Sequence, residues 1–213
     1  MDLSGNSIAG HADLLFPVST SYVNLSHNQF TSAGFKRFNA AYETLEAVDL
    51  SNNNISQAAM NIFHNIPPNL HELFLSNNVI EGTLPDTFKF EKLTHFAMAN
   101  NRINGYLPDF PNDVPLLREL DLSNQKGVAN VDGLSGTISS DVFKLVDLHA
   151  LNLAGNSLTG EIPRSIGNLD NLKLLNLSSN KLTKEIPSEL GRLIGTYLLK
   201  IIDSLFLLWQ SYL

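Results

Sequence analysis

The sequence predicts an α/β solenoid, an arc with a parallel concave sheet and a convex side of irregular or short helical segments. A pattern of apolar-x-x-apolar-x-apolar-x-x-Asn-x-apolar returns every 22 to 25 residues, as at 70–80 and 148–158, with one interval of 31. Within each unit the apolar residues alternate, as Leu73 and Leu75 do, which is typical of a strand with one buried face. A fixed period of this size indicates units that bury their apolar faces by stacking on their neighbours.

A ladder of amide side chains follows the predicted strands, one in each repeat. An amide both donates and accepts hydrogen bonds, so one side chain can satisfy backbone groups of two neighbouring coils that would otherwise be buried unpaired. We therefore interpret this ladder as structural. Its members are Asn6, Asn28, Asn53, Asn78, Asn101, Asn156 and Asn180, with Gln125 at the eighth position.

The repeats also carry a recognisable extension. Residues 158–163 read Leu-Thr-Gly-Glu-Ile-Pro, and 80–85, 103–108 and 182–187 are variants, the last with Lys184 in place of glycine. With this motif the chain resembles plant-type leucine-rich repeat proteins: the ectodomains of receptor-like kinases and receptor-like proteins, polygalacturonase-inhibiting proteins, and related repeat proteins of algae. The resemblance covers residues 1 to about 190 and implies a leucine-rich repeat arc of about eight repeats.

Some repeats depart from the pattern. Residues 58–63 read as a short helix before Pro67, and the return segment 30–45 looks helical because Phe35, Phe38 and Tyr42 have helical spacing. After Gln125 the next apolar position is delayed, which predicts a loop inserted at 126–133. The expected organisation is thus one repeat domain at 1–190 and an apolar C-terminal segment at 191–213.

The segment 191–213 has three readings: a degenerate ninth repeat or apolar cap, a membrane span, or non-native sequence. A step of 24 residues from the last repeat puts Leu199 and Ile201 on strand positions. Lys200 and Asp203 would each cost about 2.5 to 3.5 kcal/mol in a membrane span, so we favour the repeat or cap. The chain begins in mid-strand without a signal peptide, which suggests a fragment of a longer protein and leaves its compartment open.

Composition excludes several function classes. The chain has no cysteine, and its 21 acidic against 14 basic residues give a net charge of −7, which argues against nucleic acid or an anionic membrane surface as partner. The six histidines lack metal-ligand spacing, and no zinc-protease, phosphate-loop or kinase signature is complete. We therefore expect no enzyme activity, no metal and no cofactor.

The strand positions that alternate with the buried residues must face the concave side. Five of them are acids and none is Lys or Arg, so a polyanionic polysaccharide is a disfavoured ligand. We expect Phe74 to be a lone exposed aromatic there, flanked by Ser-rich positions such as Ser123 that face solvent. The candidate binding residues are Asp49, Glu72, Phe74, His95, Glu119, Asp121 and Asn152.

The leading functional hypothesis is a non-enzymatic module, like a receptor ectodomain fragment, that binds a protein or peptide on its concave face. The alternatives are an intracellular interaction scaffold and a protein similar to polygalacturonase inhibitors. The resemblance implies an extracellular or plasma-membrane location, with a cytoplasmic one for the scaffold; membrane association would come only through the parent protein or the C-terminal segment. Three Asn-x-Ser triplets are candidate N-glycosylation sites, at Asn24, Asn54 and Asn176.

Overall fold

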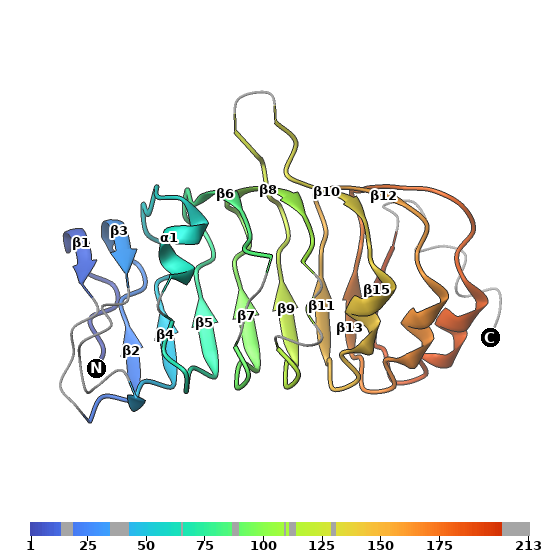
Figure 1. Cartoon of the computed structure of the whole chain (residues 1–213), viewed down its shortest axis with the longest axis horizontal. Helices are drawn as coiled ribbons and strands as arrows, with labels where there is room; N and C mark the ends of the chain where they lie inside the picture. The colour runs from blue at the N-terminus through green and yellow to red at the C-terminus, as the bar shows by residue number, and fades with distance from the viewer. Residues whose placement is uncertain are drawn as a thin grey trace.

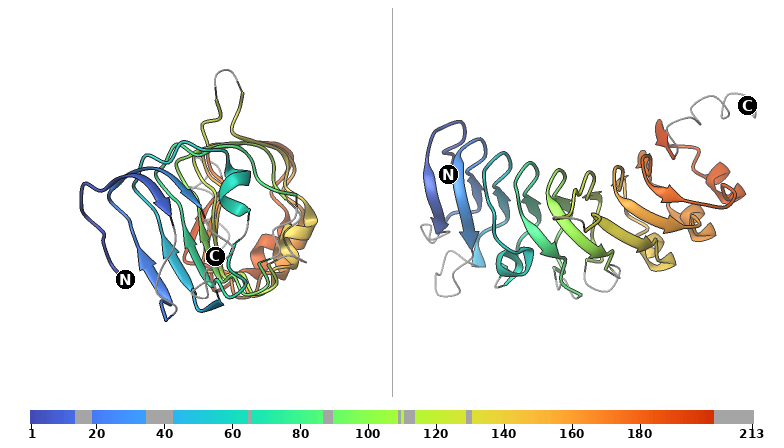
Figure 2. Two further views of the ribbon diagram at one scale, coloured as in Figure 1. Left: turned by 60° about the vertical axis from the view of Figure 1, so that its left-hand side comes forward. Right: turned by 90° about the horizontal axis from the view of Figure 1, so that it is seen from above.

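The structure, a computed structural model, is a row of stacked coils bent into a gentle arc, with the first and last described coils at opposite ends of the row (Figures 1 and 2). It describes residues 1–13, 19–34, 43–64, 66–86, 90–108, 110, 114–128 and 131–201. Each coil contributes one short strand to a common sheet, and each coil contacts mainly its neighbours. The predicted solenoid is thereby confirmed.

The main sheet has eight parallel strands in the order β15-β13-β11-β9-β7-β5-β4-β2. Its strands are β2 (Tyr22–Asn24), β4 (Ala47–Asp49), β5 (Glu72–Phe74), β7 (His95–Ala97), β9 (Glu119–Asp121), β11 (Ala150–Asn152), β13 (Leu174–Asn176) and β15 (Leu198–Lys200). An isolated bridge between Asp2 and Asn24 extends the sheet at its start. β15 pairs with β13 so that Leu199 lies beside Leu175; residues 202–213 lie outside the described residues.

A second parallel sheet, which the sequence analysis did not predict, runs along one edge of the arc (Figure 1). It contains β6 (Glu81–Thr83), β8 (Arg102–Tyr106), β10 (Leu134–Thr137), β12 (Ser157–Gly160) and β14 (Lys181–Leu182), and a separate pair joins β1 (Ala9–Asp13) to β3 (Gln29–Gly34). These strands begin in the Leu-x-Gly motif, so the motif's glycines lie in this sheet.

The glycines of the motif let successive coils approach closely. Gly82, Gly105, Gly136 and Gly160 all have positive φ, where a side chain is disfavoured. The side chain that follows the glycine in one coil covers the glycine of the next: Thr83 lies over Gly105, Tyr106 over Gly136, and Thr137 over Gly160. In the last coil Lys184 replaces the glycine and still has a φ of 70°.

The convex side carries the short α-helix and the 3₁₀ helices whose bounds the described residues give. Helix α1 (Ala59–Phe63) confirms the predicted helix before Pro67, and η3 (Ser140–Lys144), η4 (Arg164–Asn168) and η5 (Ser188–Arg192) occupy the later return segments. The prediction of a helical return from residue 30 was wrong for residues 30–34, which belong to β3, because they pair with β1. Phe35, Phe38 and Tyr42 lie outside the described residues.

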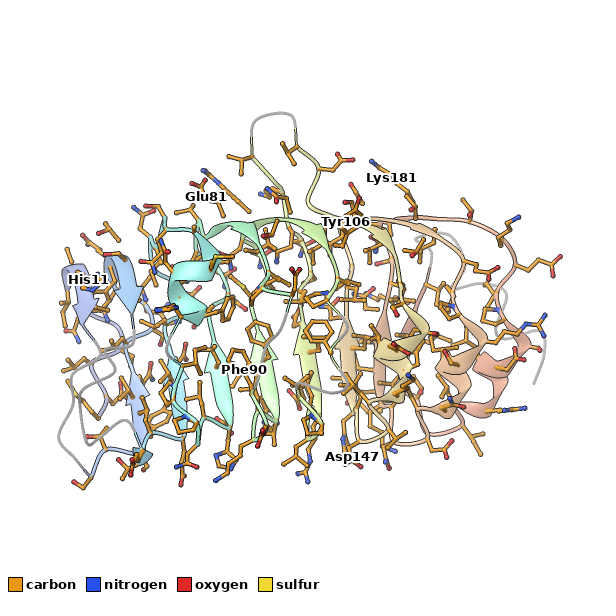
Figure 3. The ribbon with its side chains drawn as sticks, viewed as in Figure 1. His11, Glu81, Phe90, Tyr106, Asp147 and Lys181 are labelled. Carbon is orange, nitrogen blue, oxygen red and sulfur yellow. The ribbon has the colours of Figure 1, made fainter. Side chains whose placement is uncertain are left out.

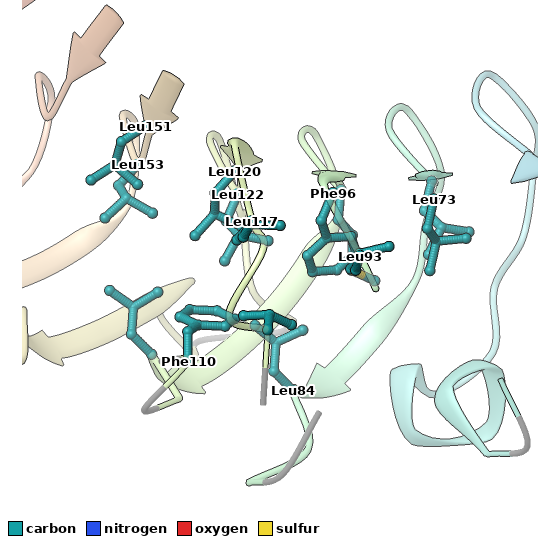
Figure 4. Packing of buried hydrophobic residues seen from close by; sticks show 14 of the residues in the cluster. Leu73, Leu84, Leu93, Phe96, Phe110, Leu117, Leu120, Leu122, Leu151 and Leu153 are labelled. Atoms are coloured by element: carbon teal, nitrogen blue, oxygen red, sulfur yellow. The ribbon is translucent and has the colours of Figure 1, made fainter. Parts of the chain in front are cut away.

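One apolar core runs the length of the arc between the two sheets and the convex helices. Leu73, Phe96, Leu120 and Leu151 from successive strands are all buried and stack along the row (Figure 4). Phe63 of α1 packs edge-on against Phe96, with ring centroids 5.9 Å apart. The core is one layer thick in each coil, so each concave strand packs directly on it through its buried residue.

The chain leaves the arc after Gln125, where the loop was predicted, and returns at β10 (Figure 1). A Cβ atom on Gly133 would lie 1.8 Å from the Gln125 carbonyl oxygen, so the two ends of this excursion touch. At its base, the Asp132 carboxylate accepts a hydrogen bond from the Lys181 ammonium at 2.7 Å. The main sheet keeps its register across the excursion, since Glu119 pairs directly with Ala150.

Candidate functional site

The amide ladder fixes the position of every concave strand. The Asn78 Nδ2 donates to the carbonyls of Leu75, in its own coil, and Leu50, in the preceding coil, both at 3.0 Å, while its Oδ1 accepts the Ile55 amide at 3.0 Å. Gln125 makes the same contacts with its longer side chain, because its Oε1 accepts the Ile103 amide at 3.1 Å. The same cross-coil pattern recurs at Asn28, Asn53, Asn101, Asn156 and Asn180. Asn6 is exposed and donates to the carbonyls of Leu3 and Ser4 in its own coil.

A second, outer amide ladder lies beside the first and was missed in the sequence. The residue before each inner ladder position has positive φ, and in four successive coils it is an asparagine, at Asn52, Asn77, Asn100 and Asn124. Asn77 donates to Asn52 at 3.0 Å and Asn100 donates to Asn77 at 2.7 Å. The sequence does contain a signal for this ladder: Asn is one of the few residues whose backbone readily adopts the left-handed conformation, and it stands directly before the inner ladder residue in these coils.

The register of the main sheet brings the candidate binding residues together on the concave face. Neighbouring strands align Glu72 with His95 and His95 with Glu119, and in a second row Phe74 with Ala97 and Ala97 with Asp121. Asp49 and Asn152 extend the second row on either side. All seven candidate residues therefore lie in two adjacent rows across five strands.

His95 stands between two carboxylates. Its Nδ1 is 3.9 Å from Glu72 and its Nε2 is 3.7 Å from Glu119. The Thr94 hydroxyl also lies 2.9 Å from Nδ1. The imidazole is 29% exposed and the two glutamates 40% and 56%, so all three side chains can reach a bound partner.

The acids of the second row also have structural contacts. Asp49 Oδ1 accepts the Ser51 amide at 2.8 Å, and Asp121 Oδ1 accepts the Ser123 amide at 2.9 Å. Asn152 donates to the other oxygen of Asp121 at 3.2 Å. These bonds orient the carboxylates at the ends of the strands, and they give Asp49, Asp121 and Asn152 a role within the sheet that the sequence analysis did not assign.

Two expectations for this face were wrong. Ser123 is 3% exposed, and Ser26 and Ser178 are also buried, because the chain turns inward after each strand. Phe74 is half-buried and is not the lone aromatic, since Tyr22 of β2 is 43% exposed. Burial raises the pKa of the Tyr22 hydroxyl, and the nearby Asp49 carboxylate raises it further.

The charge of the concave face changes at its C-terminal end. From β2 to β13 the two rows contain no Lys or Arg, but β15 adds the exposed Lys200 beside Asn176. The sequence analysis missed this cationic end of the face, because it followed the two rows only as far as Asn176 on β13.

The three candidate glycosylation sites differ in environment. Asn24 and Asn176 lie in the second concave row, and each Oδ1 accepts the hydroxyl of its own Ser, at 2.7 Å from Ser26 and 2.8 Å from Ser178. Asn54 is exposed and follows the ladder residue Asn53, outside the two concave rows.

Within the described part of the chain, no group of three His, Asp or Glu side chains is arranged to hold a metal ion. None of its helices has the length and apolar content that a membrane crossing demands.

Comparisons with known proteins identify the repeats. The family model described as leucine rich repeat matches residues 43–103, and a second model of the same description matches 147–169 and 171–193; together they cover half of the chain. No curated protein matches the sequence.

Solved structures with the same architecture include plant receptors. The Arabidopsis receptor kinase HAESA, solved with the peptide hormone IDA and the co-receptor SERK1, is 27% identical with a TM-score of 0.78 over 95% of this chain and 33% of its own. A TDR receptor is 27% identical with a TM-score of 0.74 over 94% of this chain and 38% of its own. The plant peptide hormone receptor RGFR1, solved with RGF2, is 27% identical with a TM-score of 0.64 over 92% and 34%.

The chain thus spans little more than a third of the length of these receptor chains. The matching repeat models, the plant-type glycine motif with its second sheet, and the receptor structures agree, and the chain belongs to the plant-type leucine-rich repeat proteins.

Proposed function

We propose that this chain is a non-enzymatic recognition module that binds a peptide or a protein on its concave face, as part of a receptor-like ectodomain. The observation that carries the proposal is the pair of concave rows, which present partly exposed acidic, aromatic and imidazole side chains on a rigid, continuous sheet. A rigid, preorganised surface loses little entropy on binding.

The receptor structures support this proposal. HAESA was solved in complex with the peptide hormone IDA, and the plant peptide hormone receptor RGFR1 was solved in complex with RGF2. Their matched portions share the fold of this chain over more than nine-tenths of its length. We extend the peptide-binding role to this chain on that basis, together with an extracellular or plasma-membrane location.

We retain two alternatives. An inhibitor similar to polygalacturonase-inhibiting proteins would have to approach pectin, a polyanion, and the acidic rows from β2 to β13 oppose that. An intracellular scaffold would use the same concave face for a protein, and the lack of cysteine fits that location. We also propose that residues 191–201 continue the repeat array, so that β15, the last strand of the main sheet, belongs to a ninth repeat.

The test is a selection of peptides from a displayed random library on the whole chain, followed by mapping of the bound peptide by hydrogen exchange. We expect protection of β5, β7 and β9. A matched pair of variants separates the faces: Glu119→Lys on the concave side should abolish binding, whereas Glu161→Lys, exposed after β12, should leave it unchanged. Protection confined to the convex helices would contradict the proposal.

A further inference from the structure

On the concave face Ala97 is a small residue between two larger ones, and we call the position over its methyl group the gap. On the two neighbouring strands the aligned residues are Phe74 and Asp121, and Ala97 has only a methyl group between them. Strands lie about 4.8 Å apart, so Phe74 and Asp121 extend from strands that are about two such spacings apart, one on either side of Ala97. The floor of the gap is the β7 backbone, which is fixed by pairing on both sides.

The polar wall of the gap is fixed in position. Asp121 receives the Ser123 amide and the Asn152 side chain, which hold its carboxylate at the end of β9. These two bonds leave further acceptor positions on its oxygens. Glu119, on the same strand, lies on the same face because strand side chains alternate, and it is 56% exposed.

The charges around the gap are not balanced by any cation in the two rows. Glu72 lies on β5 and Glu119 and Asp121 lie on β9, and the one basic group between them is the His95 imidazole on β7. No Lys or Arg occupies the described rows from β2 to β13. A partner with a cationic side chain would therefore complement this part of the face.

An arginine side chain fits both walls of the gap. Its methylene stem and planar guanidinium can stack on the ring of Phe74, and the guanidinium can donate two hydrogen bonds to a carboxylate. The ammonium group of lysine is more strongly hydrated and stacks less well. The juxtaposition of an aromatic residue, a small residue that leaves room, and a carboxylate held in position thus distinguishes arginine from a general preference for cations.

We propose that the gap over Ala97 binds an arginine side chain of an extended peptide partner, between Phe74 on β5 and Asp121 on β9. This inference rests on the proposed function, since it specifies the chemistry of the ligand on the same face. It assigns different roles to residues that the sequence grouped together: Phe74 stacks, Ala97 leaves room, and Asp121 with Glu119 supplies charge.

The experiment uses peptides selected on the whole chain from a random dodecapeptide library. Each selected peptide is synthesised with arginine, with lysine and with the uncharged isostere citrulline, and affinities are measured by calorimetry. We expect arginine in the selected peptides, and at least a roughly tenfold loss of affinity with citrulline, which is the ratio that a single buried contact of moderate strength gives. Lysine should bind more weakly than arginine.

Three variants test the walls. Ala97→Leu, which fills the gap, should weaken the arginine and citrulline peptides alike, since the two side chains have the same shape. Phe74→Leu, which keeps the bulk but removes the ring, and Asp121→Asn should weaken the arginine peptide more than the citrulline peptide. Ala150→Leu adds the same bulk to the other row on β11 and is the control. Melting curves verify that each variant remains folded.

The outcomes separate this inference from the proposed function. Peptides that protect the concave strands but tolerate citrulline, or that bind equally well with lysine, would overturn the arginine site and leave the proposed function standing. A failure of all peptides to bind the concave face would overturn both.

Discussion

The ring of Tyr106 lies over the backbone of Gly136, so close that a Cβ atom on that glycine would be 2.4 Å from the ring's Cδ1. Tyr106 is 76% exposed and lies at the upper edge of the arc, as Lys181 does (Figure 3). The tyrosine thus covers the next coil without being buried by it. This contact makes the glycine of the motif necessary for two reasons, its backbone conformation and its lack of a side chain.

The two reasons can be separated by substitution. Gly136→Ala should lower the free energy of unfolding by about 2 kcal/mol, because it combines a left-handed alanine with a steric clash. Gly82→Ala, with a φ of 91° but no atom near the new Cβ, should lose about 1 kcal/mol. Gly191→Ala, which has neither problem, is the control in urea unfolding. Equal losses for Gly136 and Gly82 would show that the tyrosine ring moves aside at no cost.

The reverse substitution is expected to stabilise the last coil. Lys184 has a φ of 70° at the position where other coils have glycine. Lys184→Gly should raise the free energy of unfolding by about 0.5 to 1 kcal/mol, since the relief of backbone strain exceeds the entropy cost of glycine. Lys184→Ala, which keeps the Cβ atom, should give no such gain. A stabilisation by alanine as large as that by glycine would implicate the lysine charge instead.

The inner ladder should dominate the stability of the array. Asn156→Ala removes the partner of the Gln125 amide and leaves the Leu122 carbonyl only the longer contact with Gln125 Nε2 at 3.4 Å, and should cost about 1 to 3 kcal/mol. Asn6→Ala removes an exposed side chain that bonds only within its own coil and is the matched control in thermal melts. Ser123 cannot serve as an exposed control because it is buried. Similar melting points for the two variants would contradict a ladder that joins coils.

The attachment of the loop base to β14 should depend on acidity. The hydrogen bond and charge of Lys181 hold the pKa of Asp132 below its ordinary value of 3.8. A carboxylate with a lowered pKa in the folded state contributes fully above the ordinary value, and its contribution is lost as pH falls through the lowered value. NMR titration of the Asp132 carboxyl carbon should show this, and Lys181→Gln should move the midpoint up to the ordinary range. An unchanged midpoint would mean that the ion pair is not formed in solution.

Secretion should add glycan to this chain. Expression through a eukaryotic secretory pathway is expected to modify one or more of Asn24, Asn54 and Asn176, with Asn54 the most open of the three in the folded chain. Glycans at Asn24 and Asn176 would restrict ligands to the strands from β4 to β11. Mass spectrometry before and after glycosidase treatment decides the point. Three unmodified sites in secreted protein would refute the expectation, and a ligand footprint centred on Asn24 would refute the restriction.

The repeat spacing was enough to predict the main sheet, because an apolar residue at every second position and a ladder amide leave one arrangement that buries the first and satisfies the second. Leu73, Leu75 and Asn78 lie where the pattern puts them. Gln125 shows that the ladder depends on the amide and tolerates one extra methylene.

What the sequence did not predict depends on contacts between coils. The second sheet arises because the glycine motif lets strands of successive coils pair, and the motif was read only as a family signature. Ser123 was misplaced because a strand of three residues ends before it, so the alternation that held for Glu119 and Asp121 no longer applies. The two roles of Asp121, toward Asn152 and toward solvent, required the register across a gap of 31 residues.

The unbroken register on either side of the excursion after Gln125 has a consequence for how this protein can change over time. Gln125 and Gly133 meet at the base of this loop, and Glu119 still pairs with Ala150. The geometry of the arc therefore does not depend on the length of the segment between Gln125 and Gly133, and a longer loop would add little entropy cost of closure. New sequence, introduced by mutation or by design, can be accepted at this point without disturbing the concave strands. The loop after Gln125 can therefore change in length and sequence independently of the arc.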